Sequence, residues 1–143
     1  MENQQTSNTM KMLSVDASDL EIIQYVECWI AMLAMEDYES AYDFVKHDPY
    51  YCWSPKLIEE VINGYGLPEP HPSGKVFKVT PIDTATGSPP ANDVERDVYE
   101  DNRIGYVLYD IPLNGEWSDL SATFRLENSN SQLDVILEEI HVF

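Results

Sequence analysis

The side chains with the clearest potential for chemistry are carboxylates that stand next to tyrosines. Asp43 follows Tyr42, and Asp110 follows Tyr109. Burial raises the pKa of a carboxyl group, and a tyrosine hydroxyl can donate a hydrogen bond to a developing oxyanion. Neither pair has a spacing that is diagnostic of a reaction, so the sequence offers catalysis only as an alternative and favours a non-enzymatic protein.

Metal and cofactor motifs are missing from the chain. His47, His71 and His141 are far apart and form no HxH or HExxH arrangement, so we expect no metal site. No GxGxxG, P-loop or GxSxG motif is present, and we expect no cofactor. The two cysteines, Cys28 and Cys52, fit no CxxC motif, and we do not expect a bridge between them.

Acidity is the most unusual property of the composition. The 143 residues include 26 Asp and Glu against 8 Lys and Arg, for a formal charge of −18. Such a field repels nucleic acids and anionic membranes and attracts a basic protein. The alternative to partner binding is that the charge only keeps the chain soluble. Residues 92–102, "NDVERDVYEDN", are densely acidic, and we predict partner contacts at Asp93, Glu95, Asp97, Tyr99, Glu100 and Asp101. Acids on a short edge strand can also serve only to prevent aggregation.

Targeting signals are not evident. The first 18 residues lack the basic start and long apolar core of a signal peptide, and no apolar run approaches the ~20 residues that span a bilayer. We therefore expect a cytoplasmic protein.

Three helices are predicted in the first half of the chain. Residues 1–15 read as a flexible tail, and 16–143 as one domain. Ser18 and Glu21 form a capping box ahead of the first helix, and Asp37 is a suitable N-cap for the second. Ser54 and Pro55 open a third helix, which ends at the glycines of "NGYG". The run "LPEPHPSG" must be a loop.

The second half alternates and predicts an antiparallel sheet. Strands are expected at "KVFKVTPI" (75–82), "VERDVY" (94–99), 103–113, 116–127 and 132–143. Asn114-Gly115 is a strong hairpin signal, since both residues tolerate positive φ. Alternation places Leu120 and Phe124 on a buried face, with Ser121 on the other. Three N-terminal helices on a curved antiparallel sheet form an α+β layout.

This order of elements resembles the NTF2-like (cystatin-like) superfamily over residues 18–143. The segments that carry the resemblance are "AMEDYESAYDFV" (34–45) and the terminal "ILEEIHVF" (136–143). One departure is the lack of a clear strand between the second and third helices, unless "YYCW" supplies it. The resemblance implies a cone formed by helices on the concave side of a curved sheet.

The resemblance supports two functions. Small bacterial members of the superfamily include immunity proteins, which suggests an acidic protein that neutralises a basic partner. Other members bind small molecules or catalyse reactions inside the cone, and some associate as homodimers through the sheet. For that alternative the lining residues would be Tyr25, Trp29, Tyr42, Asp43, Trp53, Tyr106, Asp110 and Trp117.

Overall fold

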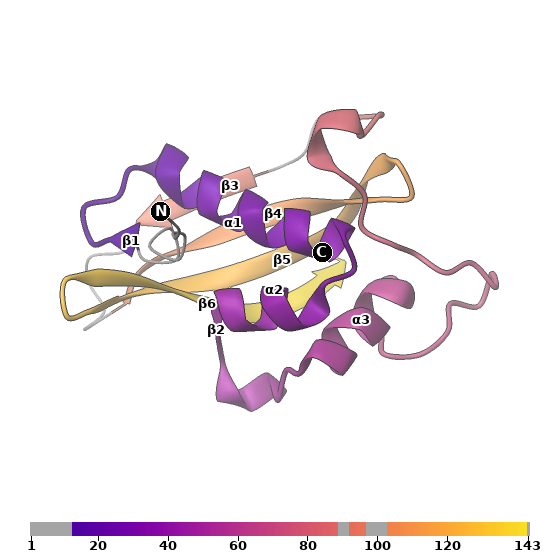
Figure 1. Cartoon of the computed structure of the whole chain (residues 1–143), viewed down its shortest axis with the longest axis horizontal. Helices are drawn as coiled ribbons and strands as arrows, with labels where there is room; N and C mark the ends of the chain where they lie inside the picture. The colour runs from indigo at the N-terminus through magenta and orange to yellow at the C-terminus, as the bar shows by residue number, and fades with distance from the viewer. Residues whose placement is uncertain (1–12, 89–91, 97–102, 143) are drawn as a thin grey trace, which may run out of the picture.

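In a computed structural model of the chain, residues 13–88, 92–96 and 103–142 are described. Within them an antiparallel sheet in the order β1-β6-β5-β4-β3 is covered on one face by helices (Figure 1). In chain order the helices and strands are β1 (Leu13–Ser14), α1 (Asp19–Ala34), α2 (Tyr38–Phe44), β2 (Lys46–His47), α3 (Pro55–Asn63), β3 (Asn92–Arg96), β4 (Arg103–Leu113), β5 (Glu116–Ser129) and β6 (Gln132–Val142). The predicted α+β class, with three helices and a curved antiparallel sheet, is confirmed.

The helices begin where the sequence places their caps. At α1 the Ser18 Oγ accepts from the Glu21 backbone N–H at 3.1 Å, and the Glu21 carboxylate accepts from the Ser18 N–H at 2.8 Å. At α2 the Asp37 carboxylate accepts from the Ser40 N–H at 3.1 Å, and at α3 the Ser54 Oγ accepts from the Leu57 N–H at 3.0 Å. These side chains satisfy backbone donors that have no partner within the helix.

The core lies between α1 and the concave face of the sheet. Val107, Tyr109 and Ile111 of β4 are buried, and so are Leu120, Ala122, Phe124 and Leu126 of β5, as the alternation predicts. Trp29 of α1 is fully buried and meets the ring of Phe124 edge to face, with centroids 5.1 Å apart. Close packing of this kind fills the space that a ligand would occupy in an open cone.

The segment predicted as a strand at 75–82 is not one. It forms a single bridge, between Val79 and Leu113, and then enters a 3-10 turn (Ile82–Thr84). Its backbone groups bond instead to the end of α3 and to the hairpin: Phe77 N donates to Asn63 O, and Thr80 N to Pro112 O. Pro81 has no N–H with which to extend a ladder.

Two short strands were not predicted. Leu13 and Ser14, which fall within the segment expected to be a tail, pair with β6 as β1. Lys46 and His47 form β2, which pairs with β6 in parallel, while the "YYCW" region forms a 3-10 turn (Pro49–Tyr51) instead. A two-residue strand carries too little alternation to be recognised from sequence.

Candidate functional site

The described part of the predicted acidic segment lies on the outer face of the sheet. Register pairs Asp93 with Leu108 and Glu95 with Tyr106. Cross-strand partners share a face, so all four point away from Val107 and the helices. Both carboxylates are exposed. Asp97, Tyr99, Glu100 and Asp101 lie outside the described residues.

Arg125 is at the centre of this face and is surrounded by carboxylates. Its guanidinium donates to Asp48 at 2.7 Å, to Glu127 at 2.7 Å and to Glu138 at 2.8 Å. Burial opposes the charge, but the three carboxylates outweigh it and raise the pKa of Arg125. The hydrogen bond from Arg125, followed by one from the Tyr50 backbone, lowers the pKa of Asp48. The cluster retains a net negative charge after this pairing.

We call this surface the outer acidic face. Among the side chains that the structure describes, it carries the cations of Arg125 and Lys46 against the carboxylates of Asp93, Glu95, Asp110, Glu127, Asp134, Glu138 and Glu139. Two of these acids are held by hydroxyl groups: Ser121 donates to Asp110 at 2.6 Å, and Tyr51 donates to Glu139 at 2.9 Å. The hydrogen bond to Glu139, together with burial, raises the pKa of Tyr51 to about 12. Half-buried Tyr106 and Leu108 lie among the acids.

The residues proposed as cone lining do not gather in one cavity. Tyr25 is buried and donates to Phe44 O at 2.7 Å, and burial raises its pKa to about 12. Together with exposed Asp43 it lines a small hollow of about 170 Å³. Trp29 is in the core, as described above, and Tyr106 and Asp110 are on the outer acidic face.

The other three lining candidates are also dispersed. Tyr42 stacks on His47, with centroids 3.9 Å apart. Trp53 is buried and donates to Glu138 O at 3.0 Å, beside β6. Trp117 lies at the start of β5, at the far end of the sheet. The eight residues therefore do not form a catalytic constellation inside the helix–sheet layer.

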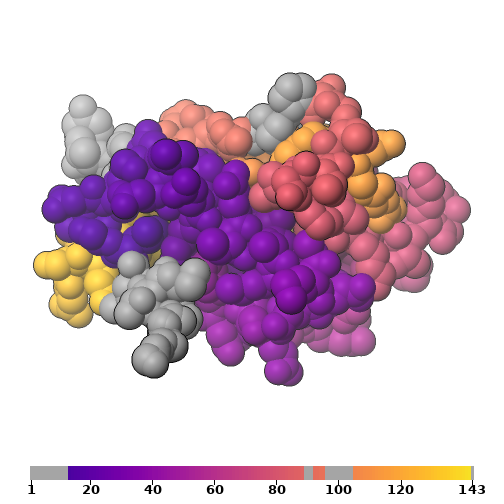
Figure 2. All heavy atoms as spheres, turned by 45° about the horizontal axis from the view of Figure 1, so that its top comes forward, coloured from indigo at the N-terminus to yellow at the C-terminus, as the bar shows by residue number. Residues whose placement is uncertain are grey.

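A larger groove lies between the proline-rich loop that follows α3 and the β4–β5 hairpin. Figure 2 shows these two segments meeting at one end of the molecule. The hollow has a volume of about 650 Å³ and is lined by Tyr65, His71, Ser73, Lys75, Phe77, Leu113, Asn114, Glu116, Trp117, Ser118 and Asp119. Of this set, only Trp117 was predicted from the sequence as a site residue. The others come from three segments that no spacing rule connects.

The aromatic side of this groove is preassembled. The ring of Tyr65 stacks on Phe77 with centroids 4.9 Å apart, and His71 meets both edge to face. The Tyr65 hydroxyl donates to Asp119, and burial together with that bond raises the pKa of Tyr65 to about 12. Trp117 lies against Tyr109, with centroids 6.5 Å apart.

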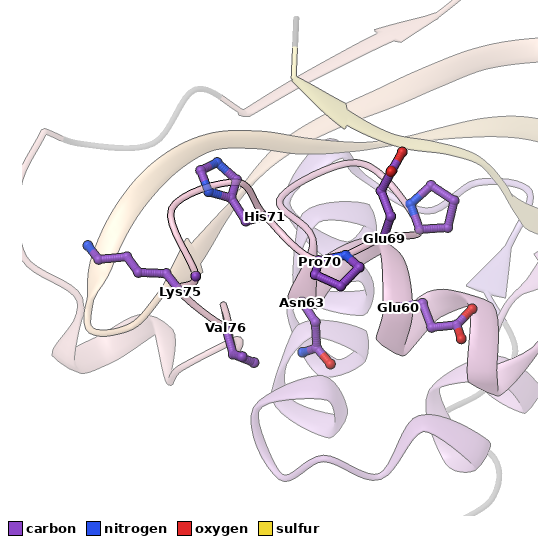
Figure 3. Close-up of a pocket in the computed structure, with 9 residues that line it drawn as sticks. Glu60, Asn63, Glu69, Pro70, His71, Lys75 and Val76 are labelled. Carbon is purple, nitrogen blue, oxygen red and sulfur yellow. The ribbon is translucent and has the colours of Figure 1, made fainter.

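A second hollow of about 310 Å³ lies on the other side of the same loop. Glu60 and Asn63 of α3 line it, and it shares His71 and Lys75 with the groove (Figure 3). In Figure 3 the Lys75 side chain points away from α3. The loop is thus a thin wall between two hollows.

The described residues hold no candidate metal site, disulfide or membrane-spanning helix. They contain no group of three His, Cys, Asp or Glu placed to hold a metal ion. Cys28 and Cys52 are both free thiols. In that part of the chain, no helix has the length and apolarity that crossing a bilayer requires.

Comparison of the chain with family models, with curated proteins and with solved structures found no match to any of them.

Proposed function

We propose that this protein is a non-enzymatic binding protein that captures a basic protein through the outer acidic face. The observation that carries the proposal is the excess of carboxylates over cations on the described part of that face. The resemblance of residues 34–45 and 136–143 to the NTF2-like superfamily supports an immunity-type role, in which the chain would neutralise its partner. A cytoplasmic location accords with that role.

The arrangement of charges suggests how such a face would work. Arg125 fixes three carboxylates in place, and fixed charges lose little side-chain entropy when a partner docks. The carboxylates of Asp93 and Glu95 are exposed, and none of the side chains that the structure describes forms a hydrogen bond or ion pair with them. They are available to pair with lysine or arginine, which accelerates association and fixes register. Tyr106 and Leu108 would add apolar contact between them.

Packing supports this choice over catalysis. An enzyme of the superfamily would need a cavity between helices and sheet, where the buried rings of Trp29 and Phe124 meet. A homodimer through the sheet would bring two acidic faces together, and it would form only when salt screens their repulsion.

The test is capture from a lysate of the native host, with two charge-reversed double variants. Asp93→Lys with Glu95→Lys alters the outer acidic face. Asp16→Lys with Glu39→Lys makes the same change in net charge at exposed positions outside the sheet's outer face. We expect one stoichiometric basic protein, released by high salt, lost with the first variant and retained with the second. Equal loss of the captured protein with both variants would mean that only net charge matters, and it would refute binding through a specific face. The absence of any basic partner would refute the proposal too.

A further inference from the structure

The backbone at Tyr65 is unusual for its position. The end of α3 forms a Schellman motif, in which Gly66 N donates to Val61 O at 2.8 Å and Tyr65 N to Ile62 O at 3.1 Å. The residue at Tyr65's position is normally glycine, because it adopts positive φ. Tyr65 has φ of +57°, a backbone conformation that is strained for a residue with a side chain. The chain accepts this strain and thereby places a phenol ring in the groove.

The charges of the groove favour a cation. Glu116 and Asp119 line it, and the described residues supply no ion pair to either. Lys75 lines it too and forms no salt bridge with either carboxylate. With a chain charge of −18, the surrounding potential reinforces the carboxylates and opposes an anionic ligand.

The aromatic rings of the groove favour a guanidinium over an ammonium group. Tyr65, Phe77 and Trp117 are half-buried, so parts of their surfaces remain open to the groove. A guanidinium group is planar, stacks on aromatic rings and binds carboxylates with two parallel hydrogen bonds. An ammonium group is more strongly hydrated and cannot stack in this way.

We propose that this groove holds an arginine side chain of the basic partner, stacked on the aromatic side and paired with Glu116 or Asp119. The inference rests on the proposed function for the charge of the partner. It assigns that partner a second anchor, at the hairpin end of the molecule and separate from Asp93 and Glu95. Lys75 is then a repulsive element that weakens the site, and the partner must displace its ammonium group.

The experiment uses the full-length ¹⁵N-labelled protein titrated with N-acetyl-arginine amide and followed by NMR. N-acetyl-citrulline amide is the matched control, since it has the same shape without the charge. We expect weak binding, with a Kd on the order of millimolar. The indole N–H of Trp117 and the amides of the hairpin should shift with the arginine probe. Shifts of equal size with citrulline would refute recognition of a cation, and no shifts with either probe would refute the site.

Two variants, one that removes a negative charge from the groove and one that removes a positive charge, test whether charge governs binding of the arginine probe. Glu116→Gln should weaken binding of the arginine probe about fivefold, and Lys75→Gln should tighten it by a similar factor. Both side chains are exposed, so neither change is expected to affect folding. If Lys75→Gln weakens binding of the arginine probe, Lys75 is not a repulsive element and the proposal is wrong. N-acetyl-lysine methylamide should bind at least threefold more weakly than the arginine probe.

Failure of the arginine-binding groove can be distinguished experimentally from failure of the proposed function. Once a basic partner has been captured, Trp117→Leu should lower its affinity at least tenfold, if the groove holds a partner arginine. If this variant keeps full affinity for the partner while charge reversal of Asp93 and Glu95 abolishes binding, the groove does not hold a partner arginine. The proposed function would then remain intact. Capture of no basic partner would overturn the proposed function, and the arginine titration would still decide what the groove binds.

Discussion

Replacement of Arg125 by methionine tests the electrostatic centre of the outer acidic face. The substitution keeps the apolar stem but removes the charge that Asp48, Glu127 and Glu138 share. Loss of one partner from a buried ion pair costs about 3–5 kcal/mol, whereas exposed pairs are worth ~0–1 kcal/mol. The Arg125 side chain is 20% exposed and its partners 19–34%, so screening by solvent places the loss between these limits. We expect the free energy of unfolding to fall by about 2 kcal/mol at pH 7.

The effect should depend on pH in a defined direction. The pKa of Asp48 is lowered in the folded protein, so its stabilising contribution is present above the unfolded pKa near 4 and is lost as pH falls through the lower folded value. In the Arg125→Met variant the three carboxylates repel one another at pH 7, and protonation removes that repulsion. The difference between the two proteins should therefore shrink on acidification to about pH 3.

Urea unfolding at pH 7 and pH 3 measures both quantities. With m near 2 kcal/mol/M, a loss of about 2 kcal/mol lowers the midpoint by about 1 M. Lys46→Met is the control, since Lys46 pairs with Asp134 but its side chain is 63% exposed. It should cost less than about 1 kcal/mol. A loss below about 0.5 kcal/mol for Arg125→Met, or a difference that is the same at pH 3 and pH 7, would refute the argument.

Three further substitutions have defined expectations. Gly64→Ala should destabilise the protein by about 2 kcal/mol or more in urea unfolding, because a Cβ would collide with two carbonyl oxygens in the loop that follows α3; wild-type stability would show that the loop can move aside. Burial lowers the pKa of His47, so its protonation favours the unfolded state, and His47→Gln should reduce the loss of stability between pH 6.5 and 5; an unchanged pH profile would contradict this. Tyr109→Phe should lower the free energy of unfolding by about 1–2 kcal/mol, because it removes the hydrogen bond of 2.7 Å that the buried Tyr109 donates to the Glu27 carboxylate. Differential scanning calorimetry measures this loss, and a loss near zero would contradict the prediction.

Local signals in the sequence were sufficient for most of the elements. The capping box fixed the start of α1, and Asn114-Gly115 formed the predicted hairpin, with φ of +51° and +89°. Both signals act between residues close in the chain. The predicted strand at 75–82 failed because its hydrogen-bond partners, including the side chain of Asn114, lie far away in sequence. Its alternation satisfied the pattern for a strand, but its pairing with β4 is limited to the bridge between Val79 and Leu113.

The candidate surfaces depended on information that a single sequence does not carry. Asp93 and Glu95 could be proposed from charge, but their position opposite Leu108 and Tyr106 requires the register of β3 on β4. The groove requires the end of α3, the proline loop and the hairpin to converge. Trp117 was predicted on the strand at 116–127 as a lining residue of the cone, whereas it lines the groove beside the hairpin. Tyr65 was unremarkable in sequence until its positive φ was seen.

Net charge alone does not identify a binding protein, since many carboxylates in this chain have structural roles. Glu21 and Asp37 cap helices, Asp48 binds Arg125, and Asp134 binds Lys46. Such acids would be needed whatever the protein binds. The acids that matter for function are those without a structural partner that also lie beside partly exposed aromatic rings, because such a surface offers both charge and apolar contact. Glu95 beside Tyr106 and Glu116 beside Trp117 meet this condition among the described residues, and they place the two proposed anchors on different parts of the same sheet.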